Sequence, residues 1–204
     1  MKATLLSICT MITVSVSSAL FAQSAEKLNP GDAMPAATVA MKNTDGKTMT
    51  LKSAMTKNGL LVMFSCNTCP FVLRNQPITN KTIDYAQAHN VGMVIINSHE
   101  AKRDGEDSYK EMVNYAKKQG YSVPYLIDDN SKVADEFGAN HTPEVFLFDN
   151  TGKLVYKGAM NDNPGDPAAS RKVFINDAID AMVMGKEVNP KVTKSIGCSI
   201  KRKA

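Results

Sequence analysis

The sequence predicts a single α/β domain, in which a central mixed sheet carries helices on both faces. Two almost uninterrupted apolar runs, residues 60–64 and 91–98, are typical of strands covered on both faces and paired in parallel. Between them, residues 70–88 keep an apolar face at helical spacing. Later, two strand-like runs within residues 143–160 flank a short Asn-Thr-Gly turn, which indicates an antiparallel pair. Strand and helix alternation followed by a hairpin favours a mixed sheet.

The first 25 residues have the pattern of a secretory signal. A single charge at Lys2 precedes an apolar stretch, and small residues surround Ala22 and Ser24. We expect residues 1–22 to be a signal peptide, cleaved after one of these two positions, and Cys9 to be removed with it. The protein would then be periplasmic or secreted, with no stable membrane insertion. The alternative is a retained membrane anchor, although hydroxyl residues dilute the apolar stretch.

Residues 26–185 are predicted to form the domain. It opens with an N-terminal β-hairpin extension, in which Asp45-Gly46 joins two β-prone stretches. The helix that is expected to begin within the C-x-x-C motif should run to about Ala88, and Pro77 should bend it. A second helix is predicted over residues 107–119 and ends at Gly120.

The second half of the domain is predicted to contain two more helices. A short one is capped by Ser131 and ends at Gly138. The last helix begins at Asp166-Pro167 and ends before Gly185. Residues 186–204 form a basic C-terminal tail, for which the simplest interpretation is a solvated segment.

Three cysteines remain after signal cleavage: Cys66, Cys69 and Cys198. An odd number argues against a disulfide scaffold and favours a working dithiol with one further thiol. Cys66 follows the buried run 60–64, and Pro70 suits the first turn of a helix. We therefore expect a helix to begin between the paired cysteines, with Cys66 at its positive end, where a thiolate is favoured. Cys69, one turn further on, would resolve a mixed disulfide.

Other classes of site fit the sequence less well. A zinc site would require a second pair of Cys or His ligands close by, and the chain has none at that spacing. The net charge is only +4, aromatic residues make up 6%, and there is no Trp, so nucleic-acid binding has no support. We expect no cofactor other than a redox-active disulfide.

His141-Thr142-Pro143 leads directly into the strand-like run that follows it. Because an X-Pro bond has only a weak preference for trans, packing can hold the Thr142–Pro143 bond in cis. In that geometry the backbone of Thr142 would face a substrate strand beside Cys66. We therefore expect Thr142 and Pro143 to be substrate-binding residues.

Residues 35–160 resemble the thioredoxin fold, and within it the exported TlpA/ResA-like reductases and the redoxin (AhpC/TSA-like) superfamily. The leading hairpin, the C-x-x-C at a strand end and the Thr-Pro loop carry the resemblance. The segments CNTCPFV and GCSIKRK resemble a redoxin subfamily with a CNxCPFV motif. This resemblance implies that Cys66 attacks, that Cys69 resolves, and that Thr142-Pro143 is the cis-proline loop.

The chain departs from the family in three ways. No acid precedes the motif on its strand, so His99, Glu100 or Glu144 would have to modulate proton transfer. An aromatic residue directly before the first cysteine is missing as well. The peroxiredoxin pattern is also absent, because no Thr lies three residues before either Cys66 or Cys69, and we therefore expect no peroxidase activity.

These features predict a thiol–disulfide oxidoreductase that reduces disulfides of exported proteins through Cys66 and Cys69. Its partners would be a protein or small-molecule disulfide and an upstream thiol electron donor. The alternative is a copper-binding protein similar to Sco-type chaperones, with Cys66, Cys69 and His141 as ligands.

The role of Cys198 stays open among three possibilities. It could be a spare thiol, a second redox partner folded back towards the site, or a link to another chain. We expect Cys198→Ser to leave the reductase activity largely unchanged, and a loss of about an order of magnitude would contradict this.

Overall fold

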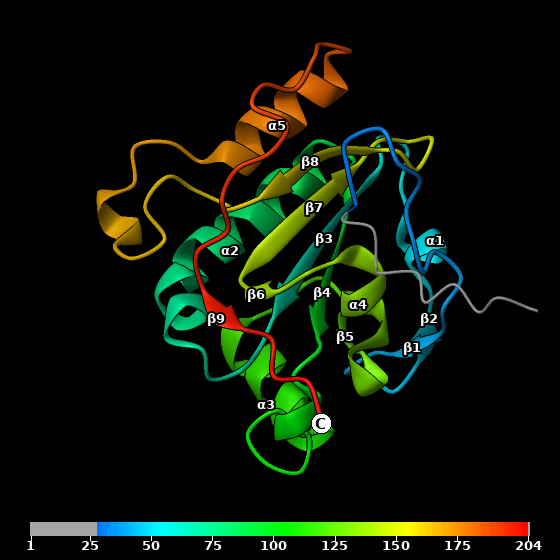
Figure 1. Ribbon diagram of the computed structural model, residues 1–204, viewed down its shortest axis with the longest axis vertical. Helices are drawn as coiled ribbons and strands as arrows, with labels where there is room; N and C mark the ends of the chain where they lie inside the picture. The colour runs from blue at the N-terminus through cyan, green and yellow to red at the C-terminus, as the bar shows by residue number, and fades with distance from the viewer. Residues whose placement is uncertain (1–27, 204) are drawn as a thin grey trace, which may run out of the picture.

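A five-stranded mixed sheet forms the centre of the molecule (Figure 1). The computed structural model describes residues 28–203, so the predicted signal peptide lies outside the described residues. The strand order is β5-β4-β3-β7-β8, in which β3, β4 and β5 are parallel and the last two pairings are antiparallel. The bounds are β3 Leu60–Ser65, β4 Gly92–Asn97, β5 Tyr125–Ile127, β7 Glu144–Phe148 and β8 Leu154–Gly158. The predicted fold class is confirmed.

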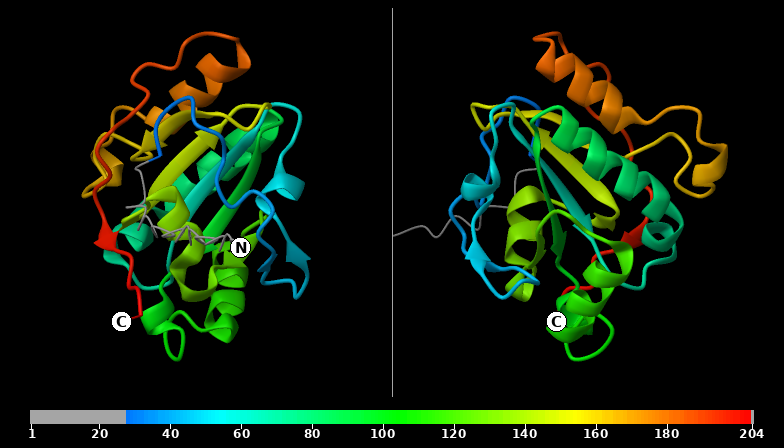
Figure 2. Two further views of the ribbon diagram at one scale, coloured as in Figure 1. Left: turned by 45° about the vertical axis from the view of Figure 1, so that its right-hand side comes forward. Right: turned by 180° about the vertical axis from the view of Figure 1, so that it is seen from behind.

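Helices cover both faces of this sheet (Figure 2). On one face lie α2 (Pro70–Ala88), α3 (Tyr109–Gln119) and α5 (Phe174–Val183), packed on every second side chain of β3, such as Leu61 and Met63. The other face is covered by α1 (Leu51–Ala54) and α4 (Lys132–Phe137). Because β3 is buried on both faces, its sequence is apolar at every position from 60 to 64.

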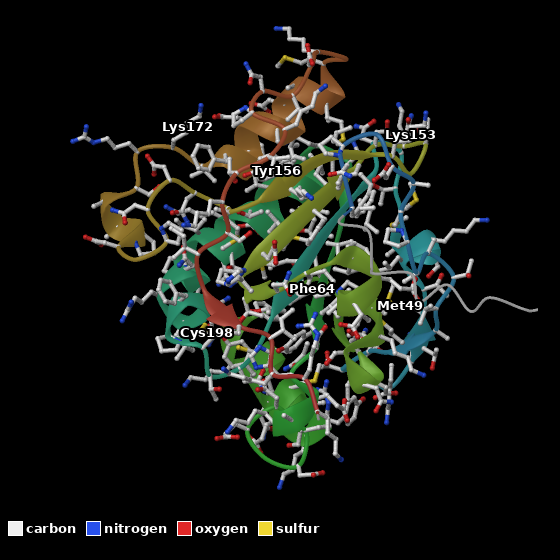
Figure 3. The ribbon with its side chains drawn as sticks, in the orientation of Figure 1. Met49, Phe64, Lys153, Tyr156, Lys172 and Cys198 are labelled. Atoms are coloured by element: carbon white, nitrogen blue, oxygen red, sulfur yellow. A yellow bond between two sulfur atoms is a disulfide. The ribbon has the colours of Figure 1, made fainter. Side chains whose placement is uncertain are left out.

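Aromatic side chains fill the layer beneath α4. The ring of Phe64 packs edge-on against Phe137 and Phe146, with ring centroids 5.3 and 5.7 Å apart. Figure 3 shows Phe64 in the interior and Cys198 on the C-terminal segment. This packing fixes the position of β3, and therefore of the residues that follow its C-terminal end.

The N-terminal hairpin is present but short. Strands β1 (Met41–Lys42) and β2 (Thr48–Met49) pair across the Asp45-Gly46 turn, where Gly46 has φ +85°. The residues after β2 form helix α1 rather than more strand, because Thr50 and Ser53 cap each other reciprocally.

The helix predicted after the cysteine motif ends at Ala88 as expected and contains Pro77, but it begins at Pro70, after both cysteines. The capping contact of one helix and the start of another differ from the prediction. Ser131 stands at the N-cap of α4, but its hydroxyl donates to Ser98, while the Asp128 carboxylate accepts from the first amides of the helix. Asp166-Pro167 begins only the 3₁₀ turn η3 (Pro167–Ala169), and α5 starts at Phe174. Two further 3₁₀ turns are η1 (Glu100–Lys102) and η2 (Asp129–Ser131).

The C-terminal segment is not a solvated tail. Thr193 pairs with Lys157 of β8, and β9 (Cys198–Ser199) then pairs antiparallel with β6 (His141–Thr142). Ile200, only 5% exposed, packs into the core beneath α4. The segment therefore runs along the edge of the domain and ends across the C-terminal end of β3 (Figure 1). No helix within residues 28–203 is long and apolar enough to span a bilayer.

Candidate active site

Cys66 and Cys69 lie where the buried strand β3 ends and helix α2 begins. Cys66 comes directly after Ser65, the last residue of β3, and Cys69 is the N-cap of α2. The helix therefore starts after the second cysteine, not between the two. The expectation that Cys66 stands at the helix N-terminus was wrong, because Pro70 occupies the first helical position and leaves residues 66–69 as a loop.

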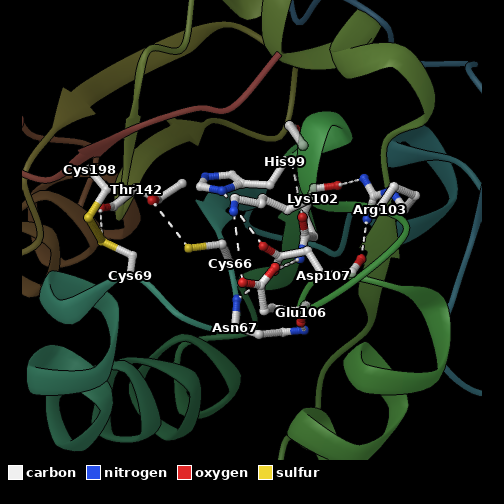
Figure 4. A network of polar contacts seen from close by, with 12 residues as sticks. Cys66, Asn67, Cys69, His99, Lys102, Arg103, Glu106, Asp107, Thr142 and Cys198 are labelled. Carbon is white, nitrogen blue, oxygen red and sulfur yellow. Dashed lines mark hydrogen bonds and ion pairs between the residues drawn. A yellow bond between two sulfur atoms is a disulfide. The ribbon is translucent and has the colours of Figure 1, made fainter. Parts of the chain in front are cut away.

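The structure contains a disulfide between Cys69 and Cys198, and Cys66 is a free, buried thiol. The two bonded cysteines are 129 residues apart in sequence. All three sulfur-bearing side chains pack in one small cluster with Phe71 and Val72 (Figure 4). Cys198 is therefore no spare thiol in this structure. The second of its three possible roles, a redox partner folded back to the site, fits this position.

Thr142 contacts both cysteines of the C-x-x-C motif. Its hydroxyl oxygen lies 3.5 Å from the Cys66 sulfur, and its carbonyl oxygen lies 3.3 Å from the Cys69 sulfur. The Thr142–Pro143 peptide bond is cis, as predicted. The backbone of Thr142 pairs with Cys198 in the β6–β9 register. The edge that we expected to bind substrate is thus occupied by the protein's own C-terminal strand.

Burial raises the pKa of the Cys66 thiol. A hydrogen bond from Thr142 and the backbone amides of Cys69 and Thr68 act in the opposite direction, while the nearby charge of Asp107 raises the pKa further. The predicted stabilisation of a Cys66 thiolate by a helix terminus is therefore outweighed. The side chain is completely buried, so the thiolate loses hydration that these hydrogen bonds replace only in part.

Asp107 is a buried carboxylate close to Cys66 (Figure 4). One of its oxygens accepts from the Asn67 amide at 2.8 Å and from the Asn97 side chain at 2.7 Å. The other oxygen has no hydrogen-bond partner among residues 28–203 and lies 3.7 Å from Nδ1 of His99. Arg103 clamps the same loop by donating to the carbonyls of Asp107 and Asn97. The segment between β4 and α3 therefore folds over the motif and supplies an acid there.

His99 is the predicted modulator that joins this network. It is 3% exposed, and its Nε2 has no hydrogen-bond partner in the part of the chain that the structure describes. Burial lowers the pKa of His99 to about 4, although the charge of Asp107 opposes the shift. The imidazole is therefore neutral at neutral pH and can accept a proton only from a strong acid or in concert with its neighbours.

The two predicted glutamates serve structural purposes. Glu100 accepts from the Asn130 amide and lies 3.5 Å from Arg103. Glu144 accepts from the His141 amide and from the Ser195 hydroxyl, so it joins β6 to the C-terminal segment. Neither contact involves a cysteine.

His141 does not complete a copper site with the cysteines. Cys69 is engaged in the disulfide, and no group of three or more His, Cys, Asp or Glu side chains within residues 28–203 is arranged to hold a metal ion. The copper alternative therefore gains no support from this geometry.

Two residues of the site were missed or left without a role by the sequence. Asp107 read as the first residue of a helix, where acidic residues are common, and nothing nearby links it to Cys66. For Cys198, the only indication in the sequence was the odd number of cysteines. Its partner could not be identified because Cys69 is 129 residues away.

Fold and site together define a thioredoxin-like α/β domain with a cysteine cluster at the end of its central strand. Residues 29–173 match the Redoxin family model, and the chain belongs to the redoxin family. The search of curated proteins gave no match.

Solved structures agree with this assignment. A hypothetical protein from Sinorhizobium meliloti 1021 is 32% identical, with a TM-score of 0.78 over 88% of this chain and 97% of the other. An uncharacterized conserved protein from Geobacillus kaustophilus is 34% identical, with a TM-score of 0.79 over 86% and 93%. A protein described as a thiol:disulfide interchange protein, DsbE, from Chlorobium tepidum is 14% identical, with a TM-score of 0.57 over 78% and 98%, and shares the fold.

Proposed function

We propose that this protein is a thiol–disulfide oxidoreductase that reduces disulfides of exported proteins. The observation that carries the proposal is the meeting of one free thiol, Cys66, and one disulfide, Cys69–Cys198, at the same residue, Thr142. A thiol beside a disulfide is the arrangement that thiol–disulfide exchange requires. Membership of the redoxin family supports the same chemistry.

In the reductive direction, the Cys66 thiolate attacks a substrate disulfide and forms a mixed disulfide, while the substrate's other sulfur leaves. Cys69 then attacks the Cys66 sulfur, releases the reduced substrate, and forms the Cys66–Cys69 disulfide. Cys69 must be a free thiol for this step, so the Cys69–Cys198 bond has to be opened first. The hydroxyl of Thr142 can donate to the Cys66 thiolate as it forms.

The predicted signal sequence places this reaction in the periplasm or outside the cell. There an upstream thiol donor would have to restore the dithiol, because each turnover leaves Cys66 and Cys69 as a disulfide. The substrate is a protein or small-molecule disulfide.

The proposal is tested with insulin as the disulfide substrate and dithiothreitol as the reductant. We expect Cys66→Ser and Cys69→Ser each to lower the turnover by about a hundredfold, because one removes the attacking sulfur and the other the resolving sulfur. Ser199→Ala, on the exposed side of β9, is the matched control. If both cysteine variants keep the turnover of the wild-type protein, the proposed function is wrong.

Two further assays separate the other possibilities. Hydrogen peroxide in place of insulin should not be consumed above the rate without protein, and rapid consumption would contradict the prediction that this is not a peroxiredoxin. One equivalent of Cu(I) tests the alternative, because a copper protein would retain the metal and lose it in the His141→Ala variant.

A further inference from the structure

The C-terminal strand β9 places Cys198 beside Thr142 and Cys69. Gly197 makes this possible, because a Cβ at that position would lie 2.2 Å from the carbonyl oxygen of Thr142. On the other side of Cys198, the Ile200 amide donates to the Asn140 carbonyl at 2.9 Å, and the Ile200 side chain is buried. Contacts on both sides of Cys198 therefore fix its sulfur beside Cys69.

The residues that follow β9 are held at two more points. The carbonyl of Lys201 accepts from the Ala101 amide at 2.8 Å, which ties the strand to the loop after β4. Arg202 donates to the Asp135 carboxylate and to the Ala139 carbonyl. Besides the disulfide, several specific contacts therefore hold the C-terminal segment in place.

The three cysteines differ in accessibility. Cys66 is 0% and Cys69 is 4% exposed, whereas Cys198 is only partly buried, on the outer side of the cluster. An external thiol can therefore reach the Cys69–Cys198 disulfide from the Cys198 side. A disulfide between Cys66 and Cys69 would be less accessible than this one, because both residues are buried while β9 is paired with β6.

We propose that Cys198 is a third redox cysteine, which transfers the disulfide from the buried Cys66–Cys69 pair to the surface, where an external thiol reduces it. The inference rests on the proposed function and adds a residue to it. The external partner is a dithiol reductant, and the site that it meets is Cys198 on β9.

The transfer is an exchange without net oxidation of the protein. After substrate has been reduced, the Cys198 thiolate attacks the Cys69 sulfur, so that the Cys69–Cys198 bond forms and the Cys66–Cys69 bond breaks. The electron pair leaves on the Cys66 sulfur, which takes up a proton. This step produces the arrangement seen in the structure, a Cys66 thiol with a Cys69–Cys198 disulfide.

The external dithiol then completes the cycle. Its first thiolate attacks Cys198, forms a mixed disulfide and expels Cys69 as a thiolate. Its second thiol attacks the donor sulfur of that mixed disulfide, which frees Cys198 as a thiol and leaves the donor oxidised. Two electrons pass from the donor to the protein, which is left with three thiols.

The surroundings of Cys69 and Cys66 favour the two bond-breaking steps of this cycle. Cys66 is the leaving sulfur in the internal exchange, and Cys69 is the leaving sulfur when the external thiol attacks Cys198. Cys69 stands at the N-cap of the 19-residue helix α2, where the helix dipole stabilises a leaving thiolate. Cys66 is completely buried, so it is stable as the protonated thiol that the first exchange produces. The positions of the two sulfurs thus fit their separate roles.

The test follows the disulfides through one cycle. Wild-type protein is fully reduced, freed of reductant and mixed with one equivalent of glutathione disulfide. Samples are quenched with acid at intervals, and their disulfides are mapped by mass spectrometry. Dithiothreitol is then added, and the rate at which the protein disulfide disappears is measured.

We expect the Cys66–Cys69 disulfide to appear first and the Cys69–Cys198 disulfide to replace it. In Cys198→Ser, oxidation should stop at Cys66–Cys69, and reduction by dithiothreitol should be about tenfold slower or more, because the remaining disulfide is buried. Gly197→Ala keeps the cysteine but displaces β9, and it should slow the same two steps. Ser199→Ala, the neighbouring exposed residue, is the control.

The outcomes separate the relay from the proposed function. If neither wild type nor Cys198→Ser is oxidised by glutathione disulfide, the proposed function fails. If both are oxidised and are then reduced at equal rates, the relay is wrong and the dithiol chemistry stands. If Cys66→Ser forms the Cys69–Cys198 disulfide as fast as wild type does, Cys66 does not precede Cys198 and the relay is also wrong.

Discussion

Thr142 is the residue around which the three sulfur atoms are arranged. Its hydroxyl contacts Cys66, its carbonyl contacts Cys69, and its backbone pairs with Cys198. One buried residue therefore contacts Cys66, Cys69 and Cys198 through different atoms. These contributions can be separated by changing the side chain alone.

Replacing Thr142 with Val keeps the shape of the side chain and removes the hydroxyl. Because that hydroxyl stabilises the thiolate, we expect the pKa of Cys66 to rise further. A hydrogen bond to a charged group contributes about 1.5–3 kcal/mol, so alkylation of reduced protein by iodoacetamide at neutral pH should slow roughly tenfold or more. Alkylation of Cys66, followed by mass spectrometry, measures the effect, and an unchanged rate would contradict it.

Asp107 acts on Cys66 with the opposite sign. Asp107→Asn removes the negative charge and keeps an oxygen that can accept from Asn67 and Asn97. Because a like charge disfavours the thiolate, its removal should lower the pKa of Cys66 and speed alkylation at neutral pH by roughly threefold or more. A slower reaction in this variant would mean that the carboxylate serves mainly to position the loop. The variants at residues 142 and 107 control for each other, because they should shift the pKa of Cys66 in opposite directions.

At the scale of elements, the segment between β4 and α3 closes over the site. Asn97 and Asp107 tie its two ends together, and Arg103 donates to the carbonyl of each. The tie also fixes Asn67, which lies between the two cysteines of the motif. A loop with buried polar groups of this kind is stable only while its hydrogen bonds are intact.

The pH dependence of stability reports on this segment through His99. Burial lowers its pKa to about 4, below the ordinary value of 6.5, so between these values the unfolded chain binds a proton that the folded protein does not. The free energy of unfolding should therefore fall as the pH decreases from 6.5 towards 4, by up to about 3 kcal/mol from this group. Urea unfolding of the oxidised protein at the two ends of that range measures the loss.

His99→Gln is the control for this prediction. The amide is uncharged throughout the range, so the variant should lose less stability on acidification than wild type. Equal losses in both proteins would assign the acid sensitivity to other groups.

At the scale of the whole molecule, the Cys69–Cys198 disulfide closes a loop of most of the domain. It joins the start of α2 to β9 across a separation of 129 residues. Cross-links of long loops restrict the unfolded chain most strongly. The C-terminal segment, which also pairs with β8 and packs through Ile200, is therefore an integral part of the domain.

Reduction should consequently destabilise the protein. We expect the free energy of unfolding to fall by about 2–5 kcal/mol when dithiothreitol is present, and Cys198→Ser to show a similar loss without reductant. Cys66→Ser, which leaves the disulfide in place, should still respond to reductant as wild type does. Urea unfolding with and without reductant measures the difference, and a wild type insensitive to reductant would contradict the prediction.

Much of the architecture could be read from local patterns. The two almost uninterrupted apolar runs became the parallel pair β3 and β4, and the helix after the cysteine motif ends at Ala88 as predicted. Helix starts were less predictable. Ser131 was expected to cap α4, but Asp128 does so, because a distant acceptor, the Ser98 carbonyl, binds the serine hydroxyl.

The sequence by itself determined the fold class, the position of Cys66 and Cys69 at a strand end, and the Thr142-Pro143 loop, because each depends on residues that are neighbours in the chain. Only the tertiary structure decided that Asp107 lies beside Cys66 and that Cys198 bonds to Cys69. These contacts join residues 40 or more positions apart, as between Asn67 and Asp107. Their free energy comes from packing and burial that exist only when the chain has folded, so no local pattern records them.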